Sequence, residues 1–200
     1  WVDANGENRI IIIPGANHEI ESKKAIKAIE SITGLAVVVA QCEIKQEVTL
    51  AAFSAAKKRG CVTILNPAPY QPLSEELLAV TDWIIPNETE FKELHGQFPT
   101  SDDALKSFRP GKNSIVTLGS EGAVLITADG NLTRVSAPKV NAVDTTGAGD
   151  AFVGVFAYAL ANGNNPEDAM KLGVKVASMS VTRKGAQSSY PSQAEIETLS

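Results

Sequence analysis

The sequence predicts an α/β fold in which a mainly parallel sheet is covered by helices on both faces, giving three layers. Short apolar runs suited to strands alternate with longer segments of helical periodicity. Glycine and proline mark short turns between them, and we find no repeat, low-complexity tract or flexible linker. Asp129-Gly130 lies between two apolar runs and predicts a hairpin. We therefore expect the sheet to be antiparallel at one edge.

The expected elements alternate along the chain. Strands are predicted at residues 8–13, 35–42, 61–65, 82–86, 113–118 and 122–127, with a hairpin partner at 132–135 and a short strand ending at 140–143. Helices are predicted at residues 46–59, 73–80, 88–95, 101–108, 149–162 and 166–182. The pair His95-Gly96 is typical of a helix end.

Composition excludes several classes of function. The 200 residues are 44% hydrophobic and 20% charged, which suits one sizeable core. A net charge of -5 argues against binding to nucleic acid or to an anionic membrane surface. The apolar runs are far shorter than the roughly 20 residues of a membrane span, and no signal peptide is evident. We expect a cytoplasmic protein in which Cys42 and Cys61 are free thiols.

The stretch Asp144-Thr145-Thr146-Gly147-Ala148-Gly149-Asp150 precedes a long apolar helix and is the richest chemical signal. Free N–H groups at a helix N-terminus attract anions, and glycines allow a phosphoryl group to approach the backbone. We interpret Gly147, Ala148 and Gly149 as an anion hole and Asp150 as a general base for phosphoryl transfer. An aspartate that only complements the helix N-terminus is the alternative. The pattern is neither a Walker A loop nor a dinucleotide fingerprint.

Two further segments favour nucleotide and metal binding, although each can also be interpreted as having only a structural role. Thr117 to Gly122 follows a strand and is either a nucleotide loop or a tight turn. Asn87 and Glu90 lie on one face at a helix start, where they could share a hydrated Mg²⁺ or form a capping box.

The glycine turn with Ala151 to Gly154 resembles the second signature of the ribokinase or phosphofructokinase B family of sugar kinases. Further segments resemble family motifs in the same order along the chain: Pro14–Asn17, Gln41–Glu43, Asn66–Pro69, Asn87–Glu90, Thr117–Gly122 and Val181–Gln187. The resemblance covers nearly the whole chain. It implies ATP-dependent phosphorylation of the primary hydroxyl of D-ribose, with Mg²⁺ and K⁺ as cofactors.

The resemblance also assigns roles to individual residues. Glu43 and Asp150 would bind the sugar. The nucleotide would contact Asn87, Thr117, Gly119, Gly122 and Gly149, and Asn87 and Glu90 would hold Mg²⁺ through water. The K⁺ site would comprise Asp144, Thr146, Ser180, Arg183, Gly185 and Ser189. A position that often carries histidine against adenine in this family is Val174 here, which implies a more apolar base pocket.

The resemblance implies a domain division as well. Residues 1–13 would be the remnant of a small β lid, and residues 14–200 the α/β kinase core. Since Trp1 is not a start methionine, we expect a missing segment that carries the first strands and part of the sugar site. A homodimer through the lid is expected. Two alternatives stay open, namely a kinase for another sugar or nucleoside, and a nucleotide-binding fragment without catalysis.

Overall fold

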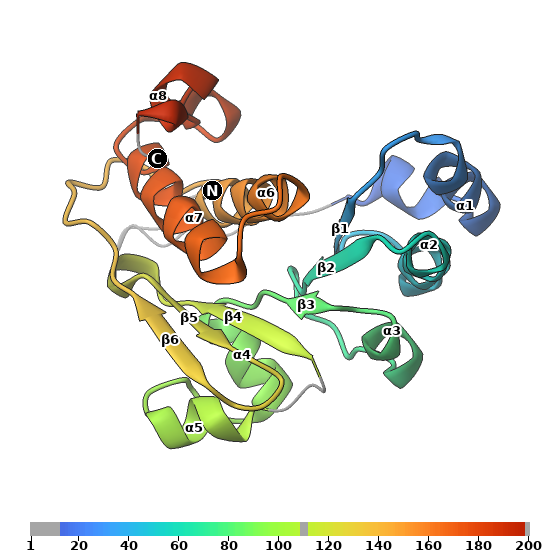
Figure 1. The fold of residues 1–200 in the computed structure, drawn as a ribbon, viewed down its shortest axis with the longest axis horizontal. Coiled ribbons are helices and arrows are strands. Elements are labelled where there is room, and N and C mark those ends of the chain that lie inside the picture. The colour runs from blue at the N-terminus through green and yellow to red at the C-terminus, as the bar shows by residue number, and fades with distance from the viewer. Residues whose placement is uncertain (1–12, 109–111, 199–200) are drawn as a thin grey trace.

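The computed structural model describes residues 13–108 and 112–198. These residues form one six-stranded sheet whose spatial order, β1-β2-β3-β4-β5-β6, is also the chain order (Figure 1). The strands are β1 (Val37–Gln41), β2 (Val62–Asn66), β3 (Trp83–Ile84), β4 (Asn113–Thr117), β5 (Ala123–Ile126) and β6 (Leu132–Val135). Pairing is parallel from β1 to β4 and antiparallel from β4 to β6. The predicted mixed sheet is confirmed.

Helices cover both faces of the sheet. They are α1 (Ser22–Ser31), α2 (Gln46–Lys58), α3 (Glu75–Ala79), α4 (Glu88–His95), α5 (Asp102–Ser107), α6 (Ala148–Ala161), α7 (Pro166–Ser180) and α8 (Gln193–Glu197). Short 3-10 turns, η1 (Gly15–Glu19), η2 (Gly119–Glu121) and η3 (Gln187–Ser189), complete the described elements. Gly96 ends α4 in the left-handed conformation, as its sequence predicts.

Alternating side chains divide the core into two layers. Ile64 and Ile115 point to the side of α6 and α7, where they join Phe152, Phe156 and other residues of one cluster. The next residue of each strand points the other way, with Leu65 packed near α2 and α3 and Val116 near α4 and α5. Figure 1 shows α6 and α7 on one side of the sheet and α5 on the other. This two-residue alternation produces the three-layer arrangement.

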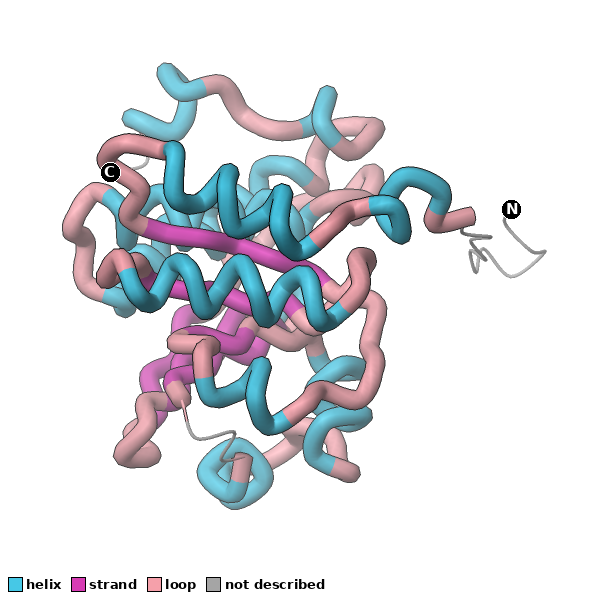
Figure 2. The backbone as a smooth tube through the Cα atoms, turned by 90° about the vertical axis from the view of Figure 1, so that its right-hand side faces the viewer, coloured by secondary structure: helices cyan, strands magenta, loops and turns pink. Residues whose placement is uncertain are grey.

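Helix α1 is absent from the sequence prediction. Its Ile29 is buried and its Ile26 half-buried, and both pack against a cluster that includes Ala55 and Ala56 of α2. Figure 2 views the molecule from this side and shows the two helices side by side. The isoleucines lie three residues apart, which is a helical spacing. Helix α8, with its Ser192 capping box, is likewise not predicted.

Three strand predictions need correction or lie beyond the described residues. Residues 140–143 form no strand; Val140 and Val143 are exposed, and the Val143 amide instead donates to the Val181 carbonyl at 2.7 Å. The strand predicted at 82–86 is reduced to Trp83–Ile84. The lid prediction for residues 1–13 falls almost wholly outside the described chain, and Ile13 itself is exposed and not in a strand.

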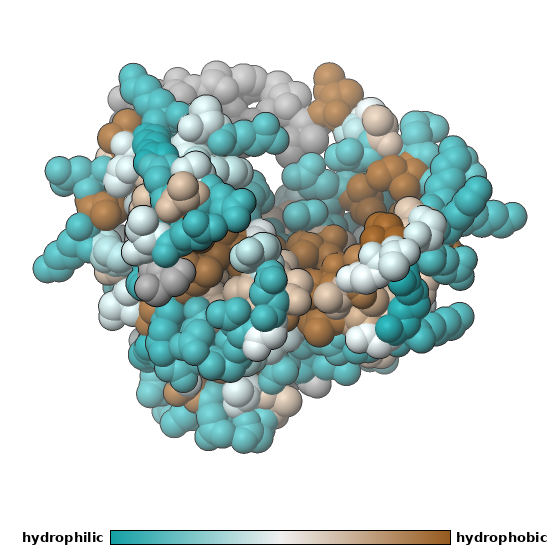
Figure 3. All heavy atoms as spheres, turned by 45° about the horizontal axis from the view of Figure 1, so that its top comes forward, coloured by the Kyte–Doolittle hydropathy of each residue, from teal (hydrophilic) through white to brown (hydrophobic). Residues whose placement is uncertain are grey.

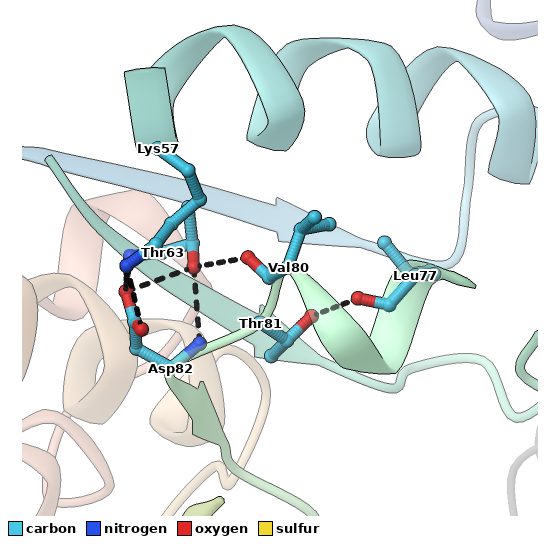
Figure 4. A network of polar contacts seen from close by, with 6 residues as sticks. All are labelled: Lys57, Thr63, Leu77, Val80, Thr81 and Asp82. Carbon is cyan, nitrogen blue, oxygen red and sulfur yellow. Dashed lines mark hydrogen bonds and ion pairs between the residues drawn. The ribbon is translucent and has the colours of Figure 1, made fainter. Parts of the chain in front are cut away.

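A polar network ties α2 to the chain before β3 (Figure 4). The Thr63 hydroxyl donates to the Val80 carbonyl at 2.7 Å and to Asp82 Oδ2 at 3.1 Å, and it accepts from the Asp82 amide at 3.0 Å. Lys57 Nζ lies 2.7 Å from the Asp82 carboxylate. Thr63 is fully buried, so the network satisfies polar groups that water cannot reach.

The distribution of hydrophobic residues and the state of the two cysteines are those expected from the composition. Figure 3 shows hydrophobic residues gathered in the hollowed middle of one face, with hydrophilic residues around them. Cys61 is buried and Cys42 half-buried, and both are free thiols as predicted. Among the described helices, none has the length and apolar character that crossing a bilayer requires.

Candidate active site

The glycine turn forms the N-terminus of α6. Gly147 precedes the helix with φ of 79°, a left-handed conformation that glycine adopts without strain, and no side chain caps this helix end. The Ala148 amide donates to the Thr145 carbonyl at 3.3 Å. Within the described residues, the amides of Gly149 and Asp150 have no acceptor. Free N–H groups at a helix N-terminus, together with the helix dipole, attract anions, so this geometry is compatible with the predicted anion hole.

Asp144 joins the glycine turn to the loop that follows α7. Its Oδ1 accepts from the Thr146 amide at 3.0 Å, and its Oδ2 accepts from the Gly185 amide at 2.9 Å. Hydrogen bonds from Gly185 first, and then from Thr146, lower the pKa of Asp144 to about 2. The carboxylate therefore stays ionised at neutral pH and holds two backbone segments 41 residues apart in sequence.

Asp150 lies in the first turn of α6 with its side chain exposed. Tyr190 lies close by, and its hydroxyl donates to the Gly147 carbonyl at 3.2 Å. Burial, and then the negative charge of Asp150, raise the pKa of Tyr190. The phenol is therefore neutral beside a carboxylate that solvent and a ligand can reach.

A cavity of about 740 Å³ opens beside the glycine turn. All five residues predicted to bind the nucleotide line it, namely Asn87, Thr117, Gly119, Gly122 and Gly149. It lies at the carboxyl ends of β3 and β4, where ligands collect in open α/β sheets. Its volume falls in the range of small-molecule and cofactor sites, about 300–1,000 Å³.

Close backbone packing holds the cavity residues Asn87, Thr117 and Gly122 in place. Asn87 and Thr117 form a parallel bridge, and the Thr117 amide donates to the Pro86 carbonyl at 3.0 Å. At Gly122, where φ is 102°, a Cβ would lie 2.0 Å from the Val135 carbonyl oxygen. Only glycine fits there. The segment 117–122 is thus both a tight turn and a cavity wall, so the two interpretations of its sequence are compatible.

Asn87 and Glu90 form the capping box that the sequence left as an alternative. Asn87 Oδ1 accepts from the Glu90 amide at 2.8 Å, and the Glu90 carboxylate accepts from the Asn87 amide at 2.9 Å and from Nδ2 at 3.0 Å. Glu90 is buried, and this burial raises its pKa despite the hydrogen bond from Asn87. The carboxylate is paired with amides and lacks a cationic partner among the described residues.

The residues expected to hold K⁺ lie in two adjacent segments joined by Asp144 and Gly185. Their side chains are already engaged. Ser180 Oγ donates to the Ala177 carbonyl at 2.8 Å, and Ser189 Oγ donates to the Ala186 carbonyl at 2.7 Å. Arg183 pairs with Glu195 of α8 at 2.5 Å. In the part of the chain that the structure describes, no cluster of three or more His, Cys, Asp or Glu side chains could hold a metal.

Glu43 lies just beyond β1 and does not line the cavity. Its exposed carboxylate accepts from Asn17 Nδ2 at 3.4 Å. Asn17 belongs to a segment whose sequence is also typical of a turn, so the sequence alone does not place it in the site. The structure brings it next to the residue expected to bind sugar.

Some residues in and beside the site were missed by the sequence analysis or only partly predicted. Val174 lines the cavity together with Ala177, Ser178 and Val181, which makes the α7 wall mostly aliphatic, as expected for Val174. Ser178 and Tyr190 carried no signal in the sequence. The sequence around a serine in an amphipathic helix, or around a tyrosine near a proline, does not indicate a functional role. The fold is needed to show which groups these residues contact.

Together, the fold and the site define an α/β protein with a glycine turn at a helix N-terminus, beside a cavity at the carboxyl ends of its strands. The chain belongs to the pfkB family of carbohydrate kinases, whose model matches residues 1–193.

Curated relatives and solved structures agree with this family. The chain is 38% identical to a ribokinase of Schizosaccharomyces pombe over 98% of its length, and 39% identical to a deoxyribokinase of Salmonella typhi over 96%. It spans 64% and 65% of the lengths of these two relatives.

Two solved structures are similar to this chain in fold as well as in sequence. A Thermotoga maritima ribokinase matches 98% of the chain with a TM-score of 0.83 and 41% identity, and the chain covers 66% of it. An Arabidopsis thaliana ribokinase complexed with ribose and ATP matches 99% with a TM-score of 0.87 and 32% identity, again with 66% covered.

Proposed function

We propose that this chain carries the catalytic and nucleotide-binding part of an ATP-dependent kinase that phosphorylates the primary hydroxyl of D-ribose. The observation that carries the proposal is the cavity bordered by the free amides of the α6 N-terminus, with Asp150 in the same helical turn. Similarity to ribokinases, one of them complexed with ribose and ATP, supports the choice of substrates.

The arrangement suits phosphoryl transfer by positioning and electrostatics. ATP would occupy the cavity with its γ-phosphoryl group at the Gly147–Gly149 turn. Asp150 would take the proton of the sugar hydroxyl as that oxygen bonds to the γ-phosphorus. The bond from phosphorus to the bridging oxygen breaks, and ADP leaves. The free amides of α6 would stabilise the charge on the transferred group.

Mg²⁺ is part of this proposal, and the residues present fit it through water. Asn87 lines the cavity, and its capping partner Glu90 is a carboxylate whose burial raises its pKa. A hydrated divalent cation near Asn87 would supply the missing positive charge and neutralise the ATP phosphates when bound.

K⁺ is proposed at the junction of the glycine turn and the loop after α7. The Ser180 and Ser189 hydroxyls donate their protons and keep their lone pairs, and each Asp144 oxygen accepts one amide, so these oxygens and the backbone carbonyls of the two segments are the candidate ligands. Glu43, with Asn17 beside it, is proposed to accept hydrogen bonds from sugar hydroxyls. A cytoplasmic location and a homodimer through residues 1–13 stay predictions.

Deoxyribose is the second candidate acceptor, because a deoxyribokinase is 39% identical to this chain. ADP release with ATP, Mg²⁺ and K⁺ tests both candidates when D-ribose, deoxyribose, fructose and adenosine are compared. Release that depends on ribose supports the first proposal. Release with another acceptor and none with ribose would replace it. Nucleotide binding without release with any acceptor would reduce the chain to a binding module.

A further inference from the structure

Ser178 lies on the cavity-facing side of α7. It is only 9% exposed, and it lines the cavity with Val174, Ala177 and Val181. These three neighbours are aliphatic. The Ser178 hydroxyl is therefore the polar group that α7 presents to the cavity among the described residues.

This hydroxyl has no hydrogen-bond partner within the described residues. The neighbouring hydroxyls behave differently. Ser180 donates to the Ala177 carbonyl at 2.8 Å, and Thr182 donates to the Met179 carbonyl at 2.7 Å. Both use the backbone of the preceding helical turn, as hydroxyls in helices commonly do. The Ser178 hydroxyl lacks such a bond and borders the cavity, so it is free to pair with a group from within the cavity.

Backbone contacts place Ser178 relative to the glycine turn. The Val181 carbonyl accepts from the amides of Val143, at 2.7 Å, and Asp144, at 3.1 Å, which fixes the end of α7 beside the start of the turn. Ser178 lies three residues earlier, about 4.5 Å along the helix axis, and Val174 lies about 10.5 Å from Val181. Val174 and Ser178 both line the cavity, so the α7 wall extends along the cavity from the end that lies beside the glycine turn. A nucleotide whose phosphates occupy the glycine turn would lay its nucleoside along this wall.

We propose that the Ser178 hydroxyl forms a hydrogen bond with the nucleoside part of the bound nucleotide and contributes to nucleoside selectivity. This inference rests on the proposed function. A hydroxyl both donates and accepts, so it can pair with a ring nitrogen, an exocyclic group or a ribose hydroxyl. The aliphatic neighbours would pack on the base, and Ser178 would orient it.

Calorimetric titration of the Ser178→Ala variant tests the inference without needing turnover. ATP, adenosine and inorganic triphosphate are titrated into the wild-type chain and the variant. Loss of one uncharged hydrogen bond should raise the Kd for ATP and for adenosine about three- to tenfold. The Kd for inorganic triphosphate should not change. Alanine favours helices, so α7 should be retained, and an unchanged thermal midpoint would verify this.

Thr182→Ala is the matched control, because it also removes a hydroxyl at the end of α7, from a residue that does not line the cavity. It should leave all three Kd values within twofold of wild type. An ATP affinity unchanged in Ser178→Ala, or reduced equally for inorganic triphosphate, overturns the role of Ser178 while the kinase proposal stands. A wild-type chain that binds inorganic triphosphate but neither ATP nor adenosine would overturn both.

Discussion

The hydroxyl of Tyr190 donates a hydrogen bond of 3.2 Å to the carbonyl of Gly147, the residue that precedes α6. A Cβ on Gly147 would lie 2.6 Å from that hydroxyl oxygen, so the ring also packs closely against the turn. With the bond from the Gly185 amide to Asp144, this contact joins the glycine turn to the loop after α7 at two points. The conformation of the proposed catalytic turn is thus set by residues some forty positions later.

Tyr190→Phe should destabilise the protein by about 1 kcal/mol, because it removes this hydrogen bond and retains the ring. Urea denaturation measures the change. Tyr158→Phe is the matched control, since Tyr158 is exposed and its hydroxyl has no partner among the described residues. Equal effects of the two substitutions would show that the Gly147 contact contributes nothing.

Asp150→Asn should lower kinase turnover by several orders of magnitude while ATP still binds, because an amide cannot take the hydroxyl proton. ADP release and ATP titration measure the two properties. Asp103→Asn, which changes an exposed acid in the first turn of α5, should leave both unchanged. A loss below about tenfold, roughly 1.4 kcal/mol, would remove Asp150 from the role of base.

The Asp144 contacts predict acid sensitivity. The folded-state pKa of Asp144 is about 2, below the ordinary value of 3.8. Its contribution to stability should therefore be complete above about pH 4 and be lost as the pH falls through about 2. Asp144→Asn should be less stable than wild type at pH 7, and the difference should shrink as the pH approaches 2. A difference that stays constant from pH 7 to 2, by urea denaturation, would contradict this assignment.

Two buried threonines offer a contrasting pair. Thr63→Val keeps the shape but leaves the Val80 carbonyl and the Asp82 amide without the hydroxyl, at a cost of about 1–3 kcal/mol. Thr49 Oγ1 is buried with no partner in the described part of the chain, so Thr49→Val should be neutral or stabilising. Urea denaturation of both variants measures the difference. If Thr49→Val lowered the free energy of unfolding as much as Thr63→Val does, this account would be contradicted.

The sequence predicted the elements whose signals are local. The short apolar runs of β4 and β5, the Asp129-Gly130 turn and the His95-Gly96 helix end specify structure within a few residues, and each was confirmed. Val140 to Val143 has the same apolar character, yet it is an exposed loop because its backbone bonds to the end of α7. A contact across about forty residues leaves no local pattern.

The candidate site shows the same difference between residues with a local sequence signal and residues placed by long-range contacts. The family resemblance assigned Asn87, Thr117, Gly119, Gly122 and Gly149 to one nucleotide site, and in the structure these residues line one cavity. Residues contributed by helix faces and later loops, such as Ser178 and Tyr190, were not predicted. Their roles depend on how α7 and the following loop pack against the turn, which periodicity does not specify.

The agreement between spatial and chain order in the sheet bears on how the protein acquires its shape. Each strand pairs with the next one along the chain, so the sheet can grow one connection at a time, by helical crossovers from β1 to β4 and by short turns from β4 to β6. Helix α6 departs from this neighbour-by-neighbour order, because it returns across the sheet to pack on β1. The glycine turn therefore reaches its final geometry only when distant parts of the chain have come together. We expect anion binding to emerge late in refolding, after most of the sheet.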